Sequence, residues 1–196
     1  VTDSHGNAIA YRLHHRSNRP PKGWLPSWHG TKAQYVRSIL RNGLKAAGST
    51  VDGNVITPPK GHYELGSTHF GVKNWAAAVF VSPSLLYAGH PCYSERIVKS
   101  GRQWCVLVRT HVRPGTFGEY DSTVLNTDPV DGEPAQPEWR VDVEGDDLIW
   151  RQRDEGSVMV TTALFVDLEF FDQIGQGGGP TYHEATDMLS TPPKRL

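Results

Sequence analysis

Two short segments of the chain carry side chains whose types and spacing could bind one ligand. His29, Gly30 and Thr31 stand where a short strand is expected to end, and such a corner can hydrogen-bond a ribose hydroxyl and an amide group. Further along, Ser84 and Tyr87 follow a second expected strand. A tyrosine can stack on a heteroaromatic ring while a serine hydroxyl binds the carboxamide of that ring. These two segments hold the candidate binding residues of the sequence.

Each segment also has a purely structural explanation. A single histidine is often satisfied by a loop carbonyl, and Tyr87 and Tyr93 can pack in the core or at its rim. The functional interpretation needs a strand that runs directly into a short helix, because that geometry presents Ser84, Tyr87 and Tyr93 toward one pocket. The elements around the candidates therefore decide between the two explanations.

The hydrophobic pattern predicts those elements. We expect a short strand over 24–29, a buried strand over 79–82, and the strongest strand over 104–111, which is rich in β-branched and aromatic residues. Apolar residues at helical spacing predict a helix over 32–42, with Gly43 as its left-handed C-cap. Strands outnumber helices, so the predicted fold class is α+β with a largely antiparallel sheet.

Weaker signals complete this outline. Thr31 is a candidate N-cap of the first helix, and Ser82 with Pro83 predicts the start of a short second helix. A further short strand is expected over 69–72. Two more strands, over 147–153 and 158–171, are expected around a turn at Asp154-Glu155-Gly156.

Proline, glycine and charge divide the chain into regions. We expect an N-terminal tail over 1–23, a single domain over 24–172, and a flexible C-terminal tail over 173–196 that is rich in glycine and proline. Residues 119–147 contain ten acids and one base, with three prolines, and are expected to leave the sheet as an acidic excursion. The region 1–118 carries fifteen Lys and Arg against four acids, so it could attract a phosphate-bearing ligand.

Composition excludes several classes of protein. The chain of 196 residues has a net charge of −1 and 37% hydrophobic residues, which suits one buried core. It lacks the run of about eighteen apolar residues that a transmembrane helix needs, so no membrane partner is expected. Two cysteines cannot build a disulfide framework, and the expected location is intracellular.

The order of these motifs resembles a known family, the ADP-ribosyltransferase superfamily, in the branch of diphtheria toxin and the poly(ADP-ribose) polymerases. The matching residues are Trp28-His29-Gly30-Thr31, Ile39-Leu40-Arg41-Asn42-Gly43-Leu44, Phe70-Gly71, Val79-Phe80-Val81-Ser82-Pro83-Ser84 and Tyr87. The resemblance covers residues 24–112, and residues 147–171 by strand pattern only. It implies two small packed antiparallel sheets with a central NAD cleft.

The resemblance also implies a function. The expected activity is NAD-dependent transfer of ADP-ribose, as mono-ADP-ribosylation, to a macromolecular acceptor. Protein is the preferred acceptor and nucleic acid the alternative, with NAD as co-substrate and no metal. The residues implied to bind NAD are His29, Gly30, Thr31, Phe80, Ser84, Tyr87 and Tyr93. Those implied to take part in catalysis are His29, Tyr87 and Glu155.

Two positions depart from the family pattern. Phe80 stands where the family has a tyrosine on the strand, so it can pack but cannot donate a hydroxyl. The family glutamate lies on a late strand, and the segment 147–152 offers none. Ile149 is the expected occupant, with Glu155, Glu144 and Asp147 as the nearby acids. A site without that carboxylate predicts transfer of a single ADP-ribose, or no activity.

Three alternatives remain at this point. A catalytically silent NAD-binding or protein-interaction module would share the same fold. The run His29-Gly30-Thr31 with Gly43-Leu44-Lys45 also resembles the RNA 2′-phosphotransferases. That resemblance implies His69 and Arg96 as the residues of the further histidine-bearing strand and the phosphate site. A zinc site could draw on His62, His69, His90 and Cys92, but their spacings match no common ligand pair, so no metal is expected.

Overall fold

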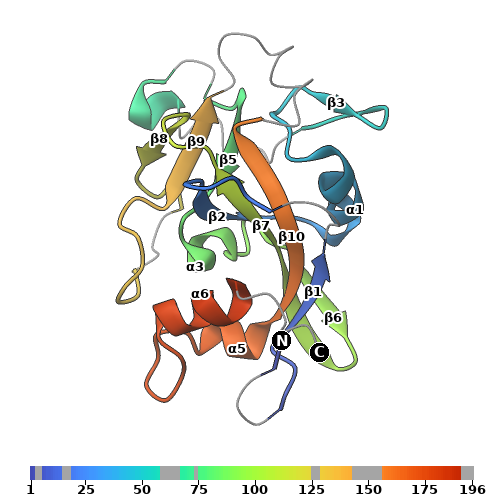
Figure 1. Ribbon diagram of the computed structural model, residues 1–196, viewed down its shortest axis with the longest axis vertical. Coiled ribbons are helices and arrows are strands. Elements are labelled where there is room, and N and C mark those ends of the chain that lie inside the picture. The colour runs from blue at the N-terminus through green and yellow to red at the C-terminus, as the bar shows by residue number, and fades with distance from the viewer. Residues whose placement is uncertain are drawn as a thin grey trace.

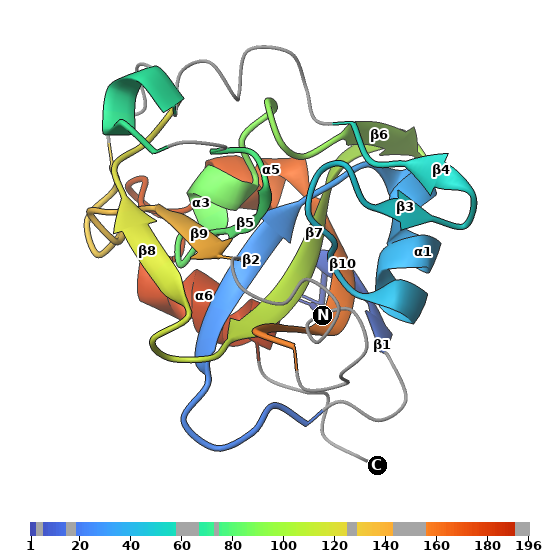
Figure 2. The same cartoon turned by 90° about the horizontal axis from the view of Figure 1, so that it is seen from above.

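The chain is an α+β protein with antiparallel sheets and few helices, as the fold-class prediction states at this coarse level. The computed structural model describes residues 1–2, 6–14, 19–57, 67–72, 75–124, 129–142 and 156–190. Strands β7 and β2 run through the middle of the molecule. In Figure 2 the small sheet with α3 lies on one side of them, and α1 with the β3–β4 hairpin lies on the other.

The larger sheet is built around one buried strand. Its strands, in spatial order, are β1 (Ala10–His14), β10 (Val158–Asp167), β7 (Arg102–Val112) and β2 (Leu25–Gly30), and β6 (Arg96–Lys99) also pairs with β7. Every pairing is antiparallel. The predicted strand 104–111 is the centre of β7, and its residues 105–108 are completely buried. A run that is apolar on both faces suits a strand covered on both sides.

A smaller sheet carries the second candidate segment. It consists of β5 (Ala78–Val81), β9 (Glu138–Asp142) and β8 (Phe117–Tyr120), again antiparallel. The two sheets meet at Trp28 and Ser82, whose backbones exchange two hydrogen bonds of 2.7 and 2.8 Å. A two-stranded hairpin, β3 (Thr50–Val51) and β4 (Asn54–Val55), lies outside both sheets.

The helices cover the larger sheet from opposite sides. They are α1 (Ala33–Asn42), α3 (Leu85–Ala88), α5 (Leu168–Asp172) and α6 (Tyr182–Ser190). Val36 of α1 packs against Val106 and Ala163 on one face. The other three helices form a second core with Cys105 and Leu107, and Figure 1 shows α5 and α6 together at one end of the sheet.

The predicted helix ends are partly wrong. Gly43 does end α1 with a positive φ of 73°, and its N–H bonds the carbonyl of Ile39. Lys32, not Thr31, is the N-cap position and gives no side-chain cap; Glu95 instead accepts from the Ala33 N–H at 2.7 Å. A carboxylate from outside the helix can serve because the first helical N–H groups have no partner within it.

Later elements also differ from their predicted bounds or type. The second helix begins after Ser84 rather than Ser82, because the Ser84 hydroxyl accepts from the Tyr87 N–H. The strand expected over 158–171 ends at Asp167, whose carboxylate caps α5. Residues 67–70 are helical, so the short strand over 69–72 is wrong. The expected strand 147–153 lies outside the described residues.

Three regions that were expected outside the packed fold contribute to it. The presumed N-terminal tail 1–23 holds β1, which pairs with β10. The acidic excursion 119–147 contains β9 and part of β8, so acid and proline content did not exclude strands there. The presumed C-terminal tail 173–196 contains α6, whose Tyr182, Ala185 and Leu189 are buried in the core.

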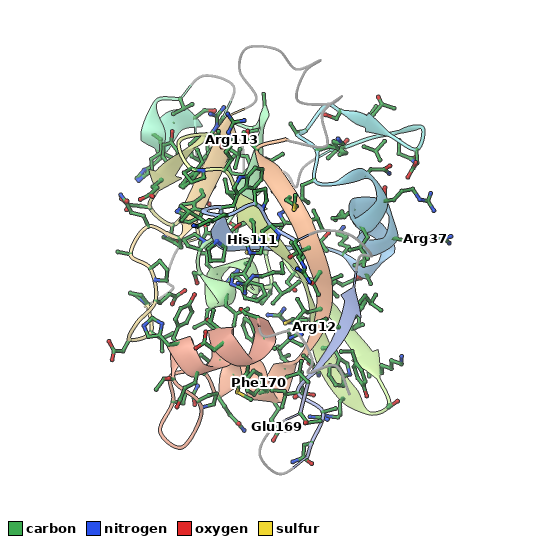
Figure 3. All side chains as sticks on the ribbon, viewed as in Figure 1. Arg12, Arg37, His111, Arg113, Glu169 and Phe170 are labelled. Carbon is green, nitrogen blue, oxygen red and sulfur yellow. The ribbon has the colours of Figure 1, made fainter. Side chains whose placement is uncertain are left out.

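Two arginines fix the end of α6 against the sheet. Arg12 of β1 donates to the carbonyl of Leu189 at 2.8 Å, and Figure 3 shows Arg12 close above α6 and α5. Arg109 of β7 donates to the Ser190 hydroxyl. Carbonyls at the end of a helix have no partner within it and favour positive charge. The helix is therefore a fixed part of the structure.

Leu189→Ala tests that conclusion. Leu189 is 2% exposed, so we expect its truncation to lower the free energy of unfolding by about 2–5 kcal/mol. His183→Ala, an exposed position on the same helix, should change it by less than about 0.5 kcal/mol. Urea denaturation measures both. Equal and small effects would mean that α6 does not stabilise the fold.

Candidate functional site

The junction of the two sheets sets the orientation of His29. Its neighbour Trp28 is held to Ser82, and the Nδ1 atom of His29 lies 2.9 Å from the carbonyl oxygen of Phe80 on β5. A carbonyl oxygen can only accept, so Nδ1 carries the proton of this hydrogen bond. Burial lowers the pKa of His29, which keeps the ring neutral near pH 7. The other ring nitrogen, Nε2, is then a hydrogen-bond acceptor.

Gly30 exposes backbone groups at the edge of the larger sheet. Successive residues of a strand direct their N–H and C=O groups to opposite sides. Thr31 donates its N–H toward β7, to Val106, whereas the backbone of Trp28 faces Ser82. The N–H and C=O of Gly30 therefore point away from β7, on the side where β5 leaves the junction. A side chain has no room here, because a Cβ would lie 2.1 Å from the carbonyl oxygen of Ala88.

The short helix α3 is held by its own N-cap residue and by a residue of α6. The Ser84 hydroxyl caps it, and the Tyr182 hydroxyl of α6 accepts from the Leu85 N–H at 3.0 Å and donates to the Pro83 carbonyl at 3.1 Å. Four residues are too few for a helix that is stable alone. The tertiary hydrogen bonds therefore fix the direction in which Tyr87 leaves the helix.

Tyr87 belongs to a cluster of three hydroxyl groups around one buried carboxylate. The carboxylate is Glu138, the first residue of β9, which is 2% exposed. Its Oε2 atom accepts from the Tyr87 hydroxyl at 2.5 Å and from the Thr123 hydroxyl at 2.6 Å. The Tyr93 hydroxyl lies 2.9 Å from that of Tyr87 and 3.0 Å from that of Thr123. We call Tyr87, Tyr93, Thr123 and Glu138 the carboxylate cluster.

The electrostatics keep the two tyrosines protonated. Burial, the charge of Glu138 and the neighbouring Tyr93 raise the pKa of Tyr87 far above its usual range. Burial and the same carboxylate raise the pKa of Tyr93 to about 12. Both hydroxyls therefore remain neutral at physiological pH, and Tyr87 donates to Glu138. A buried carboxylate held by hydroxyl donors can stabilise positive charge that develops beside it.

The cluster and the His29 strand end belong to the same region. Rings of Tyr87 and Tyr93 lie 5.2 Å apart, and a Cβ added to Gly30 would meet Tyr93 at 2.8 Å. Phe80, which holds His29, pairs with Arg140, and Glu138 lies two residues before Arg140. Alternate residues of a strand share a face, so Phe80, Arg140 and Glu138 line the same face of the small sheet.

An aromatic group covers the other end of that face. The ring of Phe80 lies 5.3 Å from that of Trp75, which also contacts Phe70 and Tyr120. Trp75 is completely buried, and Arg140 donates to its carbonyl oxygen at 2.9 Å. The face therefore has a carboxylate near one end and packed aromatic rings at the other. The Phe80 side chain, which has no hydroxyl, fits this apolar environment.

The structure brings together only some of the predicted site residues. His29, Gly30, Tyr87 and Tyr93 lie in this region, and the Phe80 carbonyl is bonded to the His29 ring. Thr31 is 6% exposed, and its backbone binds within the fold. Ser84 is completely buried, and its hydroxyl donates to Glu133. Glu155, Ile149, Glu144 and Asp147 lie outside the described residues.

Sequence reasoning missed Glu138. Glu138 lies in the region 119–147, whose prolines and charge predict an acidic excursion. A usable signal was present, since the apolar Trp139 and Val141 alternate with the polar Glu138 and Arg140, as in a strand with one covered face. A strand that is predicted to begin directly after Pro137 has Glu138 as its first residue.

The described residues of the phosphotransferase and zinc alternatives can be located as well. Arg96 donates to the carbonyl oxygens of Gly89 and Ser94, at 2.6 and 3.4 Å. His69 is exposed and its ring contacts that of Phe70. Within the described parts of the chain, no three His, Cys, Asp or Glu residues form a group that could hold a metal ion. His62 lies outside them.

Comparisons with known proteins add no family assignment. No protein-family model matches the chain, and no curated protein matches it either. Among the described residues, no helix is long and apolar enough to cross a membrane.

The protonation of His29 can be tested by NMR. Burial lowers its pKa from the ordinary value of 6.5, so we expect the folded ring to stay neutral as the pH falls through 6.5. The unfolded chain takes up the proton first, so this group makes stability fall as the pH drops below about 6.5. A titration of the imidazole resonances, assigned with His29→Gln, measures this. A pKa at or above 6.5 would contradict it.

Proposed function

We propose that the chain binds NAD and transfers its ADP-ribose to a macromolecular acceptor, protein rather than nucleic acid, on an ADP-ribosyltransferase-like fold. One observation carries this proposal. A buried carboxylate, Glu138, is held by the hydroxyl of Tyr87 beside the strand end that bears His29 and Gly30. The motif order that suggests the family thus has an acid next to it, although at a different position from the one expected.

The residues around Glu138 suit the parts of NAD. The N–H and C=O of Gly30 form an adjacent donor and acceptor, which can pair with a primary carboxamide such as that of nicotinamide. The ring of Tyr87 offers an aromatic face for the pyridine ring. Nε2 of His29 can accept from a ribose hydroxyl. A rigid set of such contacts orients the bond that breaks.

Glu138 supplies the charge that the reaction needs. Cleavage of the bond between nicotinamide and ribose builds positive charge on the ribose, as in glycoside hydrolysis. A carboxylate near the ribose 2′-hydroxyl stabilises that charge, and the low exposure of Glu138 strengthens the effect. A nucleophilic atom of the acceptor bonds to the ribose carbon as the bond to nicotinamide breaks. Nicotinamide leaves with the electron pair of that bond, and the acceptor's proton is released to solvent. Glu138 takes the role that the sequence analysis gave to Glu155.

The position of Glu138 also removes the reason to expect transfer of a single ADP-ribose. Transfer of a single ADP-ribose was expected because no carboxylate was found on the late strand. With Glu138 beside Tyr87, a fixed carboxylate is available to activate an acceptor hydroxyl. The number of units transferred then depends on the acceptor side of the site.

Glu138→Gln tests the proposal with little change in shape. We expect turnover of NAD to fall at least a hundredfold while NAD affinity changes by less than about threefold, because the charge acts on the transition state. Release of nicotinamide measures turnover, and titration calorimetry measures binding.

The matched control is Glu119→Gln, an exposed acid on β8 that pairs with Trp139 of the same sheet. It should leave both quantities unchanged. Full activity of Glu138→Gln would remove Glu138 from the mechanism. A wild-type protein that binds NAD without turnover would instead be the silent binding module.

His29→Ala tests the binding half of the site. Loss of the Nε2 acceptor should weaken NAD binding at least tenfold, which corresponds to about 1.4 kcal/mol. His69→Ala, an exposed histidine, serves as the control. Circular dichroism checks that both variants fold. Unchanged NAD affinity in a folded His29→Ala variant would contradict the proposed site.

A further inference from the structure

The hydroxyl of Ser84 is committed within the chain. It accepts from the Tyr87 N–H at 2.9 Å, and it donates its proton to the Oε1 atom of Glu133. Ser84 has no exposed surface. A hydroxyl has one proton to give, and a ligand carbonyl can only accept. A carbonyl can therefore bind Ser84 only after the bond to Glu133 has broken.

Glu133 belongs to a segment that is itself stiff. We call residues 129–137 the strap; it includes Pro129, Pro134 and Pro137, whose φ angles are fixed. The carboxylate of Glu133 also accepts from the Val130 N–H at 3.1 Å, and the Glu133 N–H bonds the Val130 carbonyl at 2.9 Å. These bonds close residues 130–133 of the strap into a turn.

The strap passes over a cavity rather than a close-packed surface. The cavity, of about 380 Å³, separates it from Leu86 and Tyr87 of α3. Its lining from the strap is Pro129, Val130, Glu133, Pro134, Ala135 and Pro137. Missing neighbours mean missing dispersion contacts, so little packing holds this part of the strap against α3.

One end of the strap has a separate anchor. A Cβ at Gly175 would lie 2.0 Å from Cγ1 of Val130, so Val130 packs closely on that turn. The contact between Glu133 and Ser84 is the hydrogen bond that joins the middle of the strap to α3. A bond to a charged acceptor is stronger than one between neutral groups. The strap is thus anchored at Val130 and latched at Ser84.

We propose that the strap is an internal competitor for the Ser84 end of the NAD site. Glu133 binds the hydroxyl that the carboxamide of nicotinamide would otherwise bind, so NAD must displace Glu133 before Ser84 can take part. This inference rests on the proposed function. It makes the chain self-inhibiting: any partner that lifts the strap raises the affinity for NAD.

Glu133→Ala is the direct test, with NAD affinity measured by titration calorimetry. Removing the competitor should tighten NAD binding about tenfold, because the bond to Ser84 no longer has to break. Asp131→Ala removes an exposed acid from the same strap and should have no effect. In a Ser84→Ala background, Glu133→Ala should give no gain, since there is no hydroxyl to release.

Hydrogen exchange of the strap amides gives a second readout that needs no NAD. Exchange over residues 130–136 should speed up in Glu133→Ala and stay unchanged in Asp131→Ala. Unchanged exchange in Glu133→Ala would overturn the latch, and so would faster exchange with equal or weaker NAD binding. Absence of NAD binding in every variant, wild type included, would overturn the proposed function and this inference together.

Discussion

The contact between Trp28 and Ser82 is the constraint on which the candidate site depends. Two backbone hydrogen bonds there join the edge of the larger sheet to the first strand of the smaller one. Because the junction fixes β2 against β5, His29 meets the Phe80 carbonyl and Gly30 lies against Tyr93. The Trp28 side chain is itself held, being 1% exposed with the Arg109 guanidinium 4.4 Å from its ring. A shift of either sheet would separate these groups.

Several of the charged groups buried around this junction are paired with groups of complementary chemistry. Glu138 is surrounded by hydroxyl donors, and Arg140 donates to a carbonyl. An ionised group that is buried without such partners costs several kcal/mol. Asp167 shows the same pattern, since it caps α5 and lies 2.8 Å from Arg102. These pairs explain how acids occupy the sheets of a chain whose acidic stretch was expected to stay outside them.

The local sequence pattern predicts an element correctly where the residues of that element have the spacing typical of it. The apolar run of β7 and the helical spacing of α1, closed by Gly43, predict those elements correctly. Local pattern was not sufficient where pairing with a distant segment forms the element. Strand β9 is short and lies among prolines, and it pairs with β5, far earlier in the chain. In α6, Tyr182, Ala185 and Leu189 have helical spacing, but the glycines before them outweighed that signal. Motif order predicts His29, Gly30 and Tyr87 as candidates. The alternation over 138–141 indicates a strand that begins with Glu138, but its contact with Tyr87 follows only from the fold.

The hydroxyl of Tyr182 has a consequence for how the protein is made. It binds the turn between Pro83 and Leu85, about a hundred positions earlier, and β1 pairs with β10. The larger sheet and the turn between Pro83 and Leu85 therefore cannot be completed when the chain has been synthesised only as far as β9. Synthesis must pass α6 before the parts close on one another, so the nascent chain exposes unpaired strand edges for most of its elongation. A chaperone that shields β7 during that interval would protect the yield of folded protein.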